Sequence, residues 1–190
     1  MAARLAVAAA GLVAACASAP APDRSSPAAT ADNPVFDAID LAEPGQREVI
    51  VVINDNAVGG RHAGVFAGTR LSDPSGTYRH VRSEDAAWRG PTLRDYVNFQ
   101  LLDGSKVRAY RFTLPQAEFA AIESRMANAG WTMPLFCAAK VQDYLAGVGP
   151  FGSLETTWWT SPKELGRQLD SIIRRPGKPG ACELPDGKPC

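Results

Sequence analysis

The side chain best suited to nucleophilic chemistry in this sequence is the thiol of Cys137. It follows Pro134-Leu135-Phe136, and the apolar spacing after it predicts a helix that begins at or just before the cysteine. The positive end of the helix dipole favours a thiolate there, and the free N–H groups of the first turn can stabilise an oxyanion. The alternative is a small, buried hydrophobic residue, which is the commoner role of a lone cysteine.

A thiol nucleophile needs a base within hydrogen-bonding reach, and His62 is the first candidate. It begins a predicted strand, 62–67, directly after a loop that contains Gly59 and Gly60. The alternative is a loop histidine without a chemical role. The other histidine, His80, follows a tyrosine and an arginine in a polar segment. It is a second candidate for the base or for a third polar group.

Asp73 is the candidate partner that would orient the imidazole. It ends the next predicted strand, 69–73. A short turn near Gly68 would place His62 and Asp73 opposite each other across a hairpin. A carboxylate in that position would accept a hydrogen bond from the imidazole and determine its tautomer. The alternative is ordinary turn chemistry, because Asp73-Pro74-Ser75-Gly76 is a turn sequence by itself.

The elements that must position these residues are strands followed by a mixture of helices and one more strand. This order predicts an α+β fold in which an antiparallel sheet packs against helices. The last helix begins with a capping box, Ser161-Pro162-Lys163-Glu164. The helix from Pro115 is expected to be capped by Thr113 or Leu114. We expect strands over 48–53, 62–67, 69–73 and 106–112, and helices over 35–41, 92–102, 115–129, 137–146 and from 162 onward.

The order of these motifs resembles that of a known hydrolase superfamily. A strand, His62-Ala-Gly-Val-Phe, an acidic residue on the next strand, the strand Val107-Arg-Ala-Tyr-Arg, a helix and then Phe136-Cys-Ala-Ala resemble the circularly permuted papain-like cysteine hydrolases. Within the NlpC-type superfamily they resemble the lecithin–retinol-acyltransferase-like branch, over about residues 48–147. The resemblance implies a permuted papain-like arrangement with Cys137 as nucleophile, His62 as base and Asp73 as third group. Members of that branch cleave or transfer acyl groups at amide, thioester or ester bonds.

Three tryptophans are candidates to line a substrate groove. Trp131 precedes the cysteine by six residues, and Trp158 and Trp159 precede the last helix. The alternative for Trp158 and Trp159 is packing in the core before the last helix, and the sequence does not decide the role of Trp131. The sequence contains no CxxC, no HExxH and no clustered set of His, Cys and Asp, so we expect no metal and no cofactor.

The N-terminus predicts export and lipid anchoring. Residues 1–15 have one positive charge and a short apolar run, as in a signal peptide. Leu12-Val13-Ala14-Ala15-Cys16 resembles a bacterial lipobox, in which Cys16 would be lipidated. The alternative is a plain signal peptide cut elsewhere. Ser18, which is not an aspartate, favours the outer membrane facing the periplasm. Residues 16–33 would form a lipidated flexible tether, because 17–33 contain no Val, Ile, Leu, Met or aromatic residue.

The remaining two cysteines lie in a tail. We expect one domain over 34–175 and a Pro/Gly-rich C-terminal tail over 176–190 that lies on the surface. In an oxidising periplasm Cys182 and Cys190 should form a disulfide, the alternative being two free thiols. Of the other two cysteines, Cys16 then belongs to the lipid anchor and Cys137 has no structural partner.

The chain therefore predicts an envelope-anchored cysteine amidohydrolase or acyltransferase that acts through a thiolate and an acyl-enzyme. Its partners would be the membrane, through the N-terminal lipid, and peptidoglycan or an acylated substrate. Twenty basic and twenty acidic residues in a chain of 190 residues disfavour nucleic acid as a partner. The alternative is a non-catalytic envelope lipoprotein that binds a partner or inhibits a toxin on the same fold.

Overall fold

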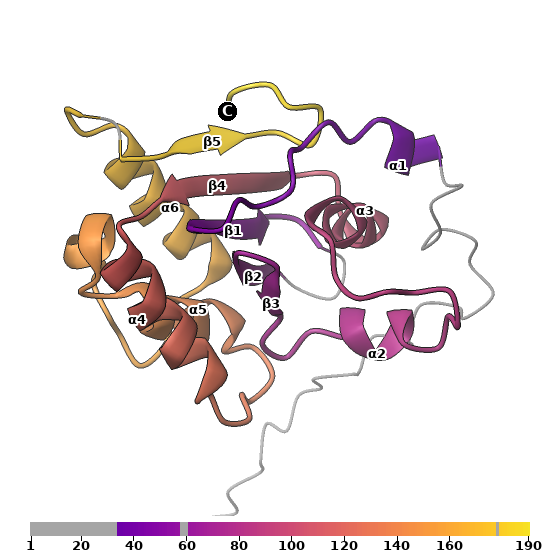
Figure 1. Ribbon diagram of the computed structural model, residues 1–190, viewed down its shortest axis with the longest axis horizontal. Coiled ribbons are helices and arrows are strands. Elements are labelled where there is room, and N and C mark those ends of the chain that lie inside the picture. The colour runs from indigo at the N-terminus through magenta and orange to yellow at the C-terminus, as the bar shows by residue number, and fades with distance from the viewer. Residues whose placement is uncertain (1–33, 58–60, 178) are drawn as a thin grey trace, which may run out of the picture.

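The computed structural model describes residues 34–57, 61–177 and 179–190. The predicted signal peptide, the tether and Cys16 lie outside the described residues. In the described part of the chain an antiparallel five-stranded sheet has the order β3-β2-β1-β4-β5 (Figure 1). The strands are β1 (Glu48–Asn54), β2 (His62–Ala67), β3 (Arg70–Ser72), β4 (Val107–Thr113) and β5 (Ala181–Glu183).

Helices cover both faces of this sheet, so the predicted α+β class, with an antiparallel sheet packed against helices, is confirmed (Figure 1). No helix within the described ranges is long and apolar enough to cross a membrane. On one face lie α1 (Pro34–Asp37), α2 (Tyr78–Arg82) and α3 (Leu93–Asp103), and on the other lie α4 (Gln116–Ala127), α5 (Cys137–Leu145), the 3-10 helix η2 (Gly149–Ser153) and α6 (Pro162–Ile173).

The central strand β1 explains why both faces must be covered. Its sequence, EVIVVIN, places apolar side chains on both sides of the sheet, and all residues from Val49 onward are buried. Val49, Val51 and Ile53 face the cluster formed by α4, α5 and α6. Ile50 and Val52 face the cluster that contains residues of α2 and α3. Two separate cores therefore hold the sheet, one on each face.

Of the two helix caps predicted from the sequence, that of α6 is confirmed and that of α4 is wrong. Ser161 caps α6 and accepts a hydrogen bond from the Glu164 N–H at 3.1 Å, as the capping box predicts. The expected cap of α4 at Thr113 or Leu114 is wrong, because the N-cap is Pro115. Thr113 is still paired in β4 with Glu48, and Leu114 donates its N–H to the Arg47 carbonyl. The strand therefore continues past the expected cap.

The C-terminal tail is more than a surface segment. Residues Ala181–Glu183 form β5, which pairs with β4 and gives the sheet its outer strand. Without this strand β4 would present an open edge of unpaired N–H and C=O groups. Cys182 is buried against the core and forms a disulfide with Cys190. The 3-10 helix η2 and the short helix α2 are also absent from the sequence-based expectation.

Candidate active site

The His62 and Asp73 side chains form a close pair beside the β2–β3 hairpin. His62 Nε2 lies 2.5 Å from Asp73 Oδ1, and only 3% of the Asp73 side chain is exposed. The register differs from the prediction, because Val65 pairs with Ser72 and Ala67 with Arg70. Continued by one residue, this register places Asp73 beside Gly64 rather than beside His62. The two side chains therefore meet diagonally on the same face of the sheet.

Cys137 approaches this pair from the neighbouring helix. It is the first residue of α5 and is 4% exposed. The strand β3 pairs only with the second half of β2, so the first half is open on that side. The thiol lies at this opening, where the Ala63 N–H and the Ala138 N–H hydrogen-bond to the sulfur. The His62 side chain also hydrogen-bonds to the thiol. Because Asp73 engages Nε2, Nδ1 is the ring nitrogen left for the sulfur.

These contacts change the protonation of both groups. Burial disfavours the imidazolium, but hydrogen bonds to Asp73 and Cys137 outweigh it and raise the pKa of His62 to about 10. Burial also disfavours the thiolate, but the hydrogen bond and positive charge of His62 outweigh this effect and lower the pKa of Cys137 below its ordinary value. The N–H groups at the sulfur lower it further. The arrangement therefore favours a thiolate–imidazolium pair at neutral pH.

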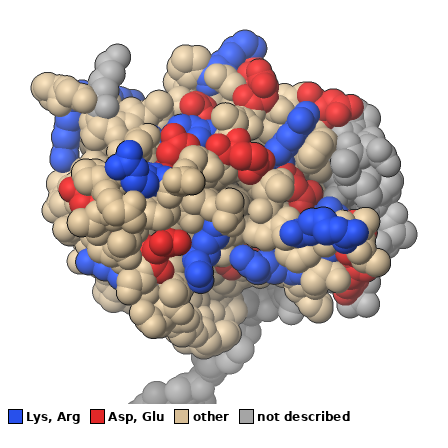
Figure 2. Space-filling view, in the orientation of Figure 1, with Lys and Arg blue, Asp and Glu red and all other residues tan. Residues whose placement is uncertain are grey.

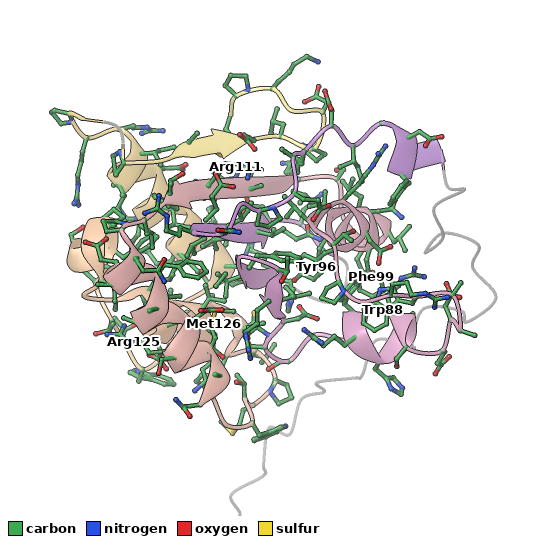
Figure 3. All side chains as sticks on the ribbon, viewed as in Figure 1. Trp88, Tyr96, Phe99, Arg111, Arg125 and Met126 are labelled. Atoms are coloured by element: carbon green, nitrogen blue, oxygen red, sulfur yellow. A yellow bond between two sulfur atoms is a disulfide. The ribbon has the colours of Figure 1, made fainter. Side chains whose placement is uncertain are left out.

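Tyr96 is a member of the group that the sequence did not single out. Its hydroxyl donates a hydrogen bond to Asp73 Oδ1 at 2.7 Å. The residue comes from α3 and lies between that helix and the β2–β3 hairpin (Figure 3). A Cβ atom at Gly64 would lie 2.2 Å from the Tyr96 hydroxyl, so the glycine leaves the space that the phenol occupies. Nothing in the local sequence around Tyr96 indicates a contact 23 residues away.

The three tryptophans lie on the surface, so the alternative of core packing for Trp158 and Trp159 is wrong. Trp131, Trp158 and Trp159 are 80%, 85% and 50% exposed. Met133 and Leu135 are exposed as well, and the Trp158 ring lies 6.3 Å from that of Phe136. We call Trp131, Met133, Leu135, Trp158 and Trp159 the apolar rim. The segments that carry it, 126–139 and 156–162, contain no charged residue. Figure 2 shows an uncharged lobe where the loop between α4 and α5 lies.

A cleft of about 350 Å³ separates the turn after β3 from the loop before α5. Trp131 lines it, together with polar side chains that include Ser72, Ser75 and Tyr144. The Ser75 hydroxyl donates to the Met133 carbonyl at 2.7 Å and so ties the two segments together. Trp158 and Trp159 do not line this cleft. A larger cavity of about 510 Å³, lined by Ile39, Val107 and Leu184 among others, includes none of the predicted site residues.

The second histidine does not join the group. His80 lies on α2 with 77% of its side chain exposed, and its Nε2 is 3.9 Å from Glu84 Oε1. In the described ranges no three His, Cys, Asp or Glu side chains form a set that could hold a metal ion.

The structure thus brings Cys137, His62 and Asp73 together and leaves His80 outside the group. Comparisons of the chain with family models, with curated proteins and with solved structures found no match. Chemically, the group has the three parts of a cysteine acyl-transfer site: an activated thiolate, a histidine that can give and take a proton, and a carboxylate that orients it.

Proposed function

We propose that the protein is a cysteine amidohydrolase or acyltransferase with a permuted papain-like arrangement. The observation that carries this proposal is the continuous contact from the Cys137 thiol through the His62 imidazole to Asp73 Oδ1, with 2.5 Å between Nε2 and Oδ1. Structural cysteines are usually packed against apolar groups alone. Here the thiol is hydrogen-bonded to a histidine and to two backbone N–H groups, which stabilise negative charge on the sulfur.

The reaction would proceed in two transfers. The Cys137 thiolate attacks the carbonyl carbon, and N–H groups of the first turn of α5 stabilise the oxyanion. The carbonyl re-forms as the bond to the leaving group breaks, and His62 gives its proton to that group. The product is a thioester on Cys137. Water or a second acceptor then attacks the thioester while His62 takes its proton, which releases the acyl group and restores the thiolate.

We propose the cell envelope as the site of action. The Leu12–Cys16 pattern supports a lipid anchor in the outer membrane, facing the periplasm. The Cys182–Cys190 disulfide supports an oxidising compartment. Peptidoglycan stem peptides are the substrate nearest to such an anchor, and an acylated lipid or protein is the other class that this chemistry serves. The polar cleft beside Trp131 is the place where we expect part of the substrate to lie.

A second candidate function is favoured by the apolar rim. Exposed Trp, Met and Leu side chains in uncharged segments are typical of a surface that contacts another molecule. A non-catalytic lipoprotein that binds a partner or inhibits a toxin would use this rim and leave the buried Cys137 unreactive. The two functions differ in what they require of the thiol.

The deciding experiment measures the reactivity of Cys137. Wild type, Cys137→Ala, His62→Ala and His80→Ala are treated with iodoacetamide from pH 5 to 10, and modified cysteines are located by mass spectrometry. We expect rapid labelling of Cys137 at neutral pH, which His62→Ala slows and His80→Ala does not. The same proteins are then assayed on ester substrates and on purified peptidoglycan. A wild-type thiol that titrates like a free cysteine and turns over no substrate leaves only the binding function.

A further inference from the structure

The Tyr96 hydroxyl shares one carboxylate oxygen with His62. Asp73 Oδ1 lies 2.5 Å from His62 Nε2 and accepts from the Tyr96 hydroxyl at 2.7 Å. The other oxygen, Oδ2, is buried and has no hydrogen-bond partner among the residues that the structure describes. Both hydrogen bonds therefore act on the same oxygen, and each limits rotation of the carboxylate about its Cβ–Cγ bond.

The packing around Tyr96 shows that this contact depends on close fit. The tyrosine is fully buried, and a buried hydroxyl that lacks a partner is costly. The phenol reaches Asp73 only because Gly64 has no side chain. Its ring packs edge-on against Phe66 and Tyr78. The hydroxyl therefore has one well-defined position, directly at the carboxylate.

We propose that Tyr96 is a positioning residue of the candidate site: it holds Asp73 so that Oδ1 faces the His62 imidazole. This inference rests on the proposed function and adds a fourth residue, from the helix layer opposite α5. Tyr96 acts on the thiol only through Asp73 and His62. If the hydroxyl is lost, the carboxylate is free to rotate, the imidazolium is held less well, and the thiolate that it stabilises becomes less favourable.

Asp73 after β3, Cys137 at the start of α5 and Tyr78 on α2 are the titratable groups that act on the Tyr96 hydroxyl from outside its own helix. His62 on β2 lies at the same carboxylate oxygen. Burial raises the pKa of Tyr96 well above its ordinary value, and the negative charge of Asp73 raises it further. The phenol is therefore protonated throughout the range in which a thiol probe can be used, and any change of the profile reports on Asp73, His62 and Cys137.

The test compares two buried tyrosines that each lose one hydroxyl. Tyr96→Phe removes the donor to Asp73. The matched control, Tyr78→Phe, removes a hydroxyl from an equally buried ring that donates to Asp95 instead, at 2.7 Å. For each full-length protein the rate of Cys137 alkylation by iodoacetamide is measured from pH 5 to 10. We expect Tyr96→Phe to move the acid limb of the curve of alkylation rate against pH to higher pH. Alkylation at pH 6.5 should be slower by about tenfold, the effect of one hydrogen bond. Tyr78→Phe should keep the acid limb of the wild type.

The possible results separate this inference from the proposed function. A wild-type thiol without activation overturns the proposed function. An activated wild-type thiol with the same acid limb in Tyr96→Phe overturns only the role of Tyr96. A shift to lower pH also overturns it, because it would mean that the hydroxyl merely competes with His62 for Oδ1. If Tyr96→Phe does not fold, Gly64→Ala replaces it as the test variant, because the added Cβ keeps the phenol but displaces its hydroxyl from Asp73. We expect the same shift of the acid limb to higher pH in this variant.

Discussion

Replacing Cys137 by serine should change how the stability of the fold depends on pH. In the folded protein the pKa of His62 is raised from 6.5 to about 10, and the pKa of Cys137 is lowered from 9.0. Above both pH 6.5 and the lowered pKa of Cys137, and up to pH 9.0, the folded pair is therefore imidazolium and thiolate, whereas the unfolded chain has a neutral imidazole and a thiol. Each form carries one proton. The pair thus adds no slope to the free energy of unfolding in this range.

Outside this range the slopes have opposite signs. Below pH 6.5 the unfolded imidazole binds a proton, so for as long as the folded Cys137 stays a thiolate the unfolded state holds more protons and stability decreases as the pH falls. Above pH 9.0 the unfolded thiol loses its proton while His62 keeps its own up to about pH 10. Stability then decreases as the pH rises. The pair predicts a plateau that ends in a decline above pH 9.0, and a thiolate that persists below pH 6.5 adds a second decline on the acid side.

In Cys137→Ser the plateau should become a slope. The serine does not titrate, so only the raised pKa of His62 remains, held by Asp73 alone. The contribution of His62 to the free energy of unfolding is fully present below pH 6.5 and is lost as the pH rises towards the pKa of His62 in the folded protein. The steepest possible slope is about 1.4 kcal/mol per pH unit. Because the variant has no thiolate to stabilise the imidazolium, we expect its free energy of unfolding to be roughly 1–3 kcal/mol lower than that of the wild type between pH 6.5 and 9.

Urea unfolding followed by circular dichroism measures this difference directly. The free energy of unfolding is determined at half-unit steps from pH 5 to 10 for wild type and Cys137→Ser, since the difference between them cancels every other titrating group. His80→Gln is the control, because it alters an exposed histidine and should leave the wild-type curve unchanged. If the two curves differ by a constant at every pH, the thiolate–imidazolium pair does not exist in the folded protein.

Three further changes test other contacts. Asp73→Asn should slow alkylation of the candidate nucleophile at pH 7 by at least about tenfold, because the charge that stabilises the imidazolium is lost. Asp143→Asn, which removes an exposed charge on α5, should not, and equal rates in both variants would contradict the role of Asp73. Ser161→Ala should lower the free energy of unfolding by about 1 kcal/mol, and no change in the urea midpoint would argue against the cap. Cys182→Ser should cost roughly 2–3 kcal/mol and increase amide exchange in β5; unaltered exchange there would show that pairing with β4 does not need the disulfide.

The sequence alone determined the features that depend on short-range chemistry. The apolar run of β1, the start of α5 at Cys137 and the capping box of α6 each follow from residues within one or two turns of one another. The disulfide joins cysteines eight positions apart. Local context also indicates Cys137, His62 and Asp73 as candidate site residues, because each stands at the start of an element or directly after its end.

Only the tertiary structure decided how these parts meet. The hairpin register, which places Asp73 beside Gly64, depends on the two-residue turn and on burial of both faces of the sheet. The Tyr96 contact needs a helix from the opposite layer and the missing side chain of Gly64. Pairing of β5 with β4 depends on an edge that exists only after the sheet has formed. The exposure of the tryptophans was likewise decided by the tertiary structure. Whether an apolar side chain is covered depends on the other elements that fold against it, and a short stretch of sequence does not specify them.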